Sequence, residues 1–136
     1  MIVKAFKLSV VGEKVPFLDI DENGWYREYI ECAYKSEIIS GYSDTEFGIG
    51  DSVSREDLAV MILRGIDICD YKLKSTDEAV KFSDADEISD YAKESVYYLE
   101  RAGIILGDGT NFNPKASATR AEAAKIVYLA LVNTNR

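Results

Sequence analysis

An internal duplication constrains the fold of this 136-residue chain more than any other feature. Phe82-Ser83-Asp84 matches Phe17-Leu18-Asp19 at a sequence offset of 82 − 17 = 65. Arg120 matches Arg55 at the same offset, 120 − 55 = 65. A unit that recurs within a chain is typical of repeat proteins, whose copies bury their apolar faces against each other. We therefore expect two copies of one unit, packed around a shared centre.

The first helix expected in each copy is amphipathic, because apolar residues recur at i, i+3, i+4 and i+7. These positions are Tyr26, Tyr29, Ile30 and Ala33 in the first copy and Ala92, Ser95, Val96 and Leu99 in the second. We expect the helices to end near Gly41 and Gly107, where glycine suits a left-handed stop. Gly-rich loops follow, over Gly41–Phe47 and Gly107–Phe112.

The second helix of each copy has a strong start signal. Thr119 and Glu122 form the capping-box pattern, and Ser54 with its Asp three residues later repeats it. Arg55 and Arg120 fall in the first turn, where the positive end of the helix dipole makes a cation cost about 0.3–1 kcal/mol. An anionic ligand bound at the helix start would pair with the arginine and offset this cost. The alternative is that they pair with some of the chain's 24 acidic residues and hold the copies together.

The start of the chain matches the end of the second predicted helix. Met1–Phe6 aligns with Met61–Ile66 and with the apolar run Ile126–Tyr128. The predicted segments are a truncated first copy with its linker (1–16), a complete copy (17–68), a linker (69–81), a second complete copy (82–132) and a tail (133–136). Pairing between chains would complete the truncated copy, so a homo-oligomer is a further expectation.

Composition excludes several functions. The formal charge of −8 disfavours nucleic acid and anionic membrane surfaces as partners. No apolar run is long enough for a membrane span, and the chain as given has no signal peptide. The absence of histidine removes Ser-His-Asp and Cys-His catalysis and His-ligated zinc. Cys32 and Cys69 lack CxxC spacing, and we expect Cys32 to pack as a small apolar residue.

A calcium site is disfavoured. Asp19-x-Asp21-x-Asn23-Gly24 copies the first half of an EF-hand loop, but Ile30 stands at the twelfth position, where a bidentate Glu is required. These acids are better explained as a helix-entry turn, and no metal or other cofactor is expected. A glycosidase would need two carboxylates at a defined spacing, and no pair stands out among so many acids. Repetition favours binding over catalysis, because each copy can make its own groove.

Several short motifs occur in both copies. The first copy has Phe17-x-Asp19 with Trp25, Ile38-Ile39-x-Gly41-Tyr42-x-Asp44 and Ser54-Arg55-Glu56-Asp57. The second has Phe82-x-Asp84, Gly103-Ile104-Ile105-x-Gly107, Asp108-Gly109-Thr110-x-Phe112-x-Pro114 and Thr119-Arg120-Ala121-Glu122. Together they resemble the S-layer homology (SLH) domain over nearly the whole chain. The resemblance implies an all-α fold, in which tandem helix-loop-helix repeats pack as a pseudo-symmetric bundle, typically of three.

The resemblance also implies a function. SLH modules anchor bacterial surface proteins non-covalently to the cell wall, by binding pyruvylated secondary cell-wall polysaccharide in grooves between repeats. We therefore expect an extracellular, non-enzymatic module of the cell wall or S-layer. Arg55 and Arg120 would pair with the ketal carboxylate, and Asp19 and Asp84 would orient the loops or accept hydrogen bonds from sugar hydroxyls. The residues expected to frame the sugar are Trp25, Gly41, Tyr42, Ser43, Gly107, Asp108 and Gly109.

The chain departs from the family pattern at some of these positions. Glu56 and Asp57 replace Ala and Glu of the usual motif, and Tyr91 replaces the Trp of the second copy. The grooves are therefore expected to differ in quality. Instead of binding sugar, Trp25 could occupy a core position, and Gly107–Gly109 could form only a turn. For the whole chain, the alternative is a structural or self-assembly repeat that binds no glycan.

Overall fold

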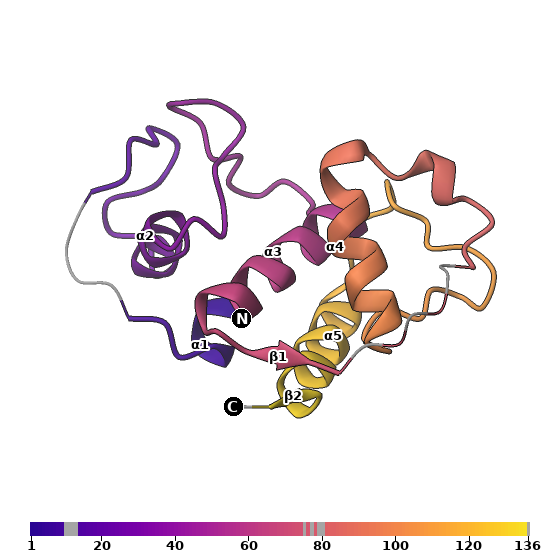
Figure 1. The fold of residues 1–136 in the computed structure, drawn as a ribbon. Coiled ribbons are helices and arrows are strands. Elements are labelled where there is room, and N and C mark those ends of the chain that lie inside the picture. The colour runs from indigo at the N-terminus through magenta and orange to yellow at the C-terminus, as the bar shows by residue number, and fades with distance from the viewer. Residues whose placement is uncertain (10–13, 75, 77, 79–80, 136) are drawn as a thin grey trace. The chain divides into compact units, whose positions relative to one another are not determined.

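The computed structural model describes residues 1–9, 14–74, 76, 78 and 81–135 (Figure 1). The elements in chain order are α1 (Ile2–Ala5), α2 (Arg27–Lys35), α3 (Arg55–Ile68), β1 (Lys72–Leu73), the 3₁₀ turn η1 (Ala85–Glu87), α4 (Asp90–Arg101), α5 (Arg120–Val132) and β2 (Thr134–Asn135). Helices dominate, which confirms the predicted all-α class. Parts of both predicted linkers and the last residue of the predicted tail lie outside the described residues.

The chain divides into two compact units, residues 1–51 and 52–136. The division falls inside the first predicted copy, so α3 belongs to the same unit as the helices of the second copy. The repeat boundaries at 17–68 and 82–132, and the assignment of residues 1–16 to a truncated copy, stay predictions.

Unit 1 contains α1, α2 and the loop that follows α2. Its core is made by Val15, Phe17, Ile20 and Ile30, with Tyr26, Tyr34, Ile39 and Phe47 packed around it. Phe17 contacts Tyr34 edge-on, with ring centroids 5.0 Å apart, and lies 5.6 Å from the Phe47 ring. The Phe that opens the repeat is therefore the residue on which helix and loop meet.

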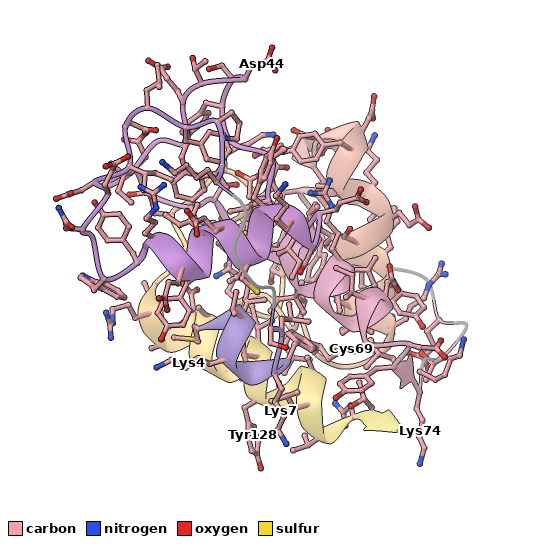
Figure 2. All side chains as sticks on the ribbon, turned by 90° about the vertical axis from the view of Figure 1, so that its left-hand side faces the viewer. Lys4, Lys7, Asp44, Cys69, Lys74 and Tyr128 are labelled. Carbon is pink, nitrogen blue, oxygen red and sulfur yellow. The ribbon has the colours of Figure 1, made fainter. Side chains whose placement is uncertain are left out.

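Unit 2 contains α3, α4 and α5, and α3 packs against both of the other helices (Figure 1). The large side chains that are fully buried in this unit are Ile62, Ile66, Val96, Leu99, Ile104, Ile105 and Phe112. β1 and β2 pair antiparallel just beyond the C-terminal ends of α3 and α5. An isolated antiparallel β-bridge pairs Ser54 with Ser117, just before the starts of α3 and α5. Tyr128 projects from α5 and is exposed (Figure 2).

The first helix of each copy ends earlier than predicted. α2 stops at Lys35 and α4 at Arg101, well before Gly41 and Gly107. Glu37 and Gly103 follow in the left-handed region, with φ of 57° and 70°. After α2, the Ile38 N–H donates to the Ala33 carbonyl and the Glu37 N–H to the Tyr34 carbonyl. The Gly103 and Ile104 N–H groups repeat this pattern after α4. Both ends are Schellman motifs, which satisfy the last helix carbonyls.

Gly41 and Gly107 serve the loops rather than the helix ends. Their φ values are 78° and 60°. A Cβ atom on Gly41 would lie 2.5 Å from Cε1 of Phe17 and 2.8 Å from the carbonyl oxygen of Glu46. A Cβ atom on Gly107 would clash with the carbonyl oxygen of Asn111 and lie 2.8 Å from Cε1 of Phe82. Each glycine therefore lets the loop backbone approach the Phe ring that opens its copy.

The predicted starts of α3 and α5 are confirmed. The Thr119 hydroxyl accepts the Glu122 N–H and the Glu122 carboxylate accepts the Thr119 N–H, which completes the capping box. At α3, Ser54 Oγ accepts the Asp57 N–H at 3.1 Å and donates to Asp57 Oδ2 at 2.6 Å. Asp57, which is shorter than the equivalent Glu122, thus accepts a hydrogen bond from the hydroxyl of the capping residue Ser54.

The glycine geometry gives a first prediction. Gly107→Ala combines the cost of a left-handed alanine, about 1–2 kcal/mol, with overpacking against Asn111 and Phe82, about 1–3 kcal/mol. Gly103→Ala is the matched control, because its φ is also positive but no atom lies within 4 Å of the new Cβ. Urea unfolding should show the larger loss of unfolding free energy for Gly107→Ala. Equal losses would contradict the close approach of Gly107 to Asn111 and Phe82.

Candidate functional site

A carboxylate holds the loop of each copy. Asp19 accepts hydrogen bonds from the backbone N–H groups of Phe47 (2.9 Å), Gly48 (2.8 Å) and Ile49 (3.1 Å). The bond from Phe47 is the main cause that lowers the pKa of Asp19, and together with the bonds from Gly48 and Ile49 it outweighs the opposing effect of desolvation. Asp19 therefore orients the loop, which is one of the two roles that the sequence left open for it.

The second copy repeats this contact at the equivalent positions. Asp84 accepts hydrogen bonds from the N–H groups of Phe112 (2.8 Å) and Asn113 (2.7 Å). The residue before each Asp also bonds the loop backbone: Leu18 N–H to the Thr45 carbonyl and Ser83 N–H to the Thr110 carbonyl. The duplication seen in the sequence is thus a duplication of hydrogen-bond geometry. Whether these acids also contact a sugar stays a prediction.

A side-chain oxygen closes the turn inside each loop. Ser43 Oγ accepts the N–H groups of Thr45 (3.3 Å) and Glu46 (3.1 Å). Asp108, its counterpart in the second copy, accepts those of Thr110 (2.9 Å) and Asn111 (2.7 Å). The bond from Asn111 is the main cause that lowers the pKa of Asp108. The turn expected at these positions is present, and each turn uses the side-chain oxygen that the sequence assigned to a ligand.

The remaining loop residues expected at the site are accessible. Tyr42 is 68% exposed, and Asp44 points outward at the tip of the same loop (Figure 2). Gly109 has a φ of 99° and open space where a Cβ would stand. A ligand could reach the backbone at both loops, and the ligand roles of Tyr42 and Gly109 stay predictions.

Trp25 lies on the surface of unit 1. Its side chain is 82% exposed and meets the rings of Tyr26 and Tyr29 edge-on, at centroid distances of 5.7 and 6.5 Å. The core position considered from the sequence is therefore wrong. A face that stays open can stack on a sugar ring, which remains a prediction. Its counterpart Tyr91 is 61% exposed.

Arg55 is the first residue of α3 and is engaged within unit 2. Its Nε donates to the Phe112 carbonyl at 2.7 Å, and its Nη1 pairs with Oε1 of Glu122. Its guanidinium carbon lies 5.4 Å from the centre of the Phe112 ring. The side chain is 16% exposed. This is the geometry expected if the arginine holds the copies together, and a ligand role for Arg55 stays a prediction.

Arg120 has the same place in α5 but different surroundings. It is exposed, and in the part of the chain that the structure describes it has no hydrogen-bond or ion-pair partner. The capping box ties down Glu122, while the cation beside it stands at the positive end of the helix dipole. Of the two arginines predicted to meet an anion, Arg120 is therefore the accessible one.

Glu122 contacts the starts of both α3 and α5. Its carboxylate accepts the Thr119 N–H at 2.7 Å and pairs with Arg55. The bond from Thr119 is the main cause that lowers the pKa of Glu122, and the Arg55 charge adds to it. The cap of α5 and the cation of α3 thus share one carboxylate.

Glu56 is a polar centre that the sequence did not assign. It is 3% exposed, and its carboxylate accepts hydrogen bonds from Lys115 Nζ (2.6 Å), Ser89 N–H (2.9 Å) and Ser89 Oγ (3.0 Å). Burial alone raises the pKa of Glu56, but the bonds from Lys115 and Ser89 outweigh it and lower the pKa below its ordinary value. The sequence carried one signal for this residue, namely the replacement of the family's Ala at this position.

The described residues hold neither a metal-ligand cluster nor a membrane-spanning helix. They contain no group of three or more His, Cys, Asp or Glu side chains placed to hold a metal ion. None of the described helices combines the length and apolar character needed to cross a membrane. Cys32 is buried, as expected for a small apolar residue.

Comparison with known proteins identifies the repeated unit. A family model described as the S-layer homology domain matches residues 16–59 and 81–124. The two matches start at the same offset as the internal duplication, 81 − 16 = 65, which confirms both the duplication and the resemblance noted in the sequence.

Similar proteins carry different names. An exoglucanase, XynX, of Acetivibrio thermocellus is 35% identical over 136 residues, covering 99% of this chain and 12% of that protein. An amylopullulanase of Thermoanaerobacterium thermosulfurigenes is 37% identical, covering 94% of this chain and 7% of that protein. The S-layer protein sap of Bacillus anthracis is 26% identical, covering 93% and 15%. The chain thus spans only a small part of each of these relatives.

The contrast between the arginines can be tested by stability. Arg55→Ala should lower the free energy of unfolding by about 1–3 kcal/mol, because it removes hydrogen bonds to Phe112 and to the charged Glu122. Arg120→Ala should change it by less than about 0.5 kcal/mol, as is usual for an exposed residue. Urea or thermal unfolding of the two variants measures both. A loss for Arg120→Ala as large as that for Arg55→Ala would mean that Arg120 has a structural partner.

Proposed function

Because the chain belongs to the S-layer homology (SLH) domain family, we propose that it anchors a larger surface protein to the bacterial cell wall by binding a pyruvylated secondary wall polysaccharide. The SLH domain is a non-catalytic anchoring module of cell-surface, wall-associated proteins. Binding is non-covalent, with Arg120 as the cation that meets the pyruvyl carboxylate.

The observation that carries the proposal is the exposed Arg120 at the first position of a capped helix. A guanidinium offers a two-donor fork that fits a carboxylate. The N-terminal N–H groups and the dipole of α5 favour the same negative charge. Since the chain as a whole carries a charge of −8, an anion must be captured by such a local arrangement rather than by the long-range field.

The relatives support anchoring rather than catalysis. Proteins named as an exoglucanase, an amylopullulanase and an S-layer protein all match this chain over a small part of their length. Attachment to one surface is a property that proteins with such different names can share. The matched part of each enzyme therefore supports a common anchoring role for this chain.

One contact favours a second candidate, a packing or self-assembly module without glycan binding. Arg55 pairs with Glu122 and donates a hydrogen bond to the Phe112 carbonyl. If the module served only packing, both arginines would be expected to have such internal partners. A homo-oligomer that completes the predicted truncated copy belongs to the same candidate. The exposure of Arg120 favours glycan binding over this candidate, because the described residues give that arginine no packing role.

Sedimentation with purified walls tests the proposal. Arg120→Ala should bind walls about 10–100-fold more weakly than the unaltered protein, because one charge-assisted hydrogen-bonded pair is worth about 1.5–3 kcal/mol. Chemical removal of pyruvate from the walls should reduce binding of the unaltered protein to the level of the variant.

Lys125→Ala is the matched control. It removes one exposed positive charge from the same helix but lies beyond the first turn, so its binding should stay close to that of the unaltered protein. Equal binding of Arg120→Ala and the unaltered protein would contradict the role of Arg120. An equal loss for Lys125→Ala would show that net charge alone is responsible.

A further inference from the structure

We propose that Ser89 and Lys115 form a carboxylate-binding site that the chain's own Glu56 occupies, so that the site is closed to external carboxylates. The donors come from two segments, the residue that precedes α4 and the loop that precedes α5. Neither segment belongs to α3, which supplies the carboxylate. Such a site holds one anion, and here that anion is a side chain.

The hydrogen bonds are those of a complete carboxylate site. Oε2 of Glu56 accepts the Ser89 N–H at 2.9 Å, and Oε1 accepts Lys115 Nζ at 2.6 Å and the Ser89 hydroxyl at 3.0 Å. Both oxygens are therefore bonded, one to a charged donor. The Tyr91 hydroxyl lies 3.3 Å from Oε1 but 2.7 Å from Asp57 Oδ1, so its single proton goes to Asp57 and the ring lines the edge of the site.

The donors are held in place by contacts that do not involve the Glu56 carboxylate. The backbone N–H of Arg55 donates to the Ala116 carbonyl at 2.9 Å, and that of Glu56 to the Pro114 carbonyl at 3.1 Å. These two bonds fix Lys115 between Pro114 and Ala116. Ser89 is fixed as the residue from which α4 starts. The site should therefore persist when only the Glu56 side chain is shortened.

The residue of the second copy that corresponds to Glu56 has no carboxylate. The residue that corresponds to Glu56 is Ala121, at 121 − 56 = 65. Ala121 is exposed and carries no anion. The substitution Glu56→Ala thus gives the first copy the residue that the second already has. The atoms it removes, a methylene and a carboxylate, have the size and charge of one acetate ion.

Local charge favours an anion in the vacated site. Lys115, whose side chain is 57% exposed, would remain without the carboxylate that now neutralises its ammonium group. Around these donors, Arg55 pairs with Glu122, Asp90 pairs with Lys93, and the Asp57 carboxylate accepts hydrogen bonds from Tyr91 and Ser54. Truncation also removes the acceptor of the half-buried Ser89 donors, and an unsatisfied donor has a free-energy cost.

Acetate rescue tests the site. At pH 7 and constant ionic strength, Glu56→Ala should have a lower Tm than the unaltered protein in sodium chloride. Replacement of chloride by acetate should raise the Tm of the variant by about 3–6 °C when acetate is at about ten times its Kd. The unaltered protein should show no such difference. Acetate carries no sugar, so the outcome is independent of the polysaccharide proposed above.

Two further variants separate this site from general salt effects. Glu56→Gln fills the same volume without charge, and Glu56→Ala with Lys115→Met lacks the cation, so neither should respond to acetate. A response of the double variant equal to that of Glu56→Ala would overturn the proposal, as would no response of Glu56→Ala. If Glu56→Ala is unfolded in chloride, recovery of its helical circular dichroism in acetate but not in acetamide is the same readout, and its absence counts against the site.

Discussion

The ion pair between Arg55 and Glu122 decides how the two copies differ. It joins the first turns of α3 and α5 and uses a carboxylate that already caps α5. The arginine that initiates α3 is thereby removed from solvent, while the equivalent Arg120 finds no such carboxylate among the described residues. Two arginines that look alike in the sequence are therefore a packing residue and an exposed cation.

Glu56 extends this difference between the copies. In the first copy the residue after the arginine is Glu56, which accepts hydrogen bonds from Ser89 and Lys115. In the second copy the same position is Ala121, next to the exposed Arg120. Within the described part of unit 2, every acid and base at the start of α3 is hydrogen-bonded to a neighbour, whereas the start of α5 keeps one cation available. On this account the anion-binding capacity of the unit is concentrated at Arg120.

The sequence predicted those features that depend on neighbouring residues or on the repeat. The caps at Ser54 and Thr119 follow from residues three apart, and the equivalence of Asp19 and Asp84 follows from the duplication. The ends of α2 and α4 were predicted too late. For α2 the left-handed residue is Glu37, which is not a recognised stop signal, while Gly41 is. For α4 the sequence offered two glycines, Gly103 and Gly107, and the helix ends before the first. The partners of Arg55 and Glu56 could not be predicted. They lie far away along the chain, and only packing brings Ser89, Lys115 and Glu122 to the start of α3.

The most direct measurement of the central claim follows the two arginine side chains separately. Their Nε–H signals can be observed by nuclear magnetic resonance while a hexosamine carrying a pyruvyl ketal is added. Our account predicts that the Arg120 signal shifts and saturates with the ligand, while the Arg55 signal, already bonded to the Phe112 carbonyl, stays in place. A shift of the Arg55 signal with Arg120 unchanged would contradict it.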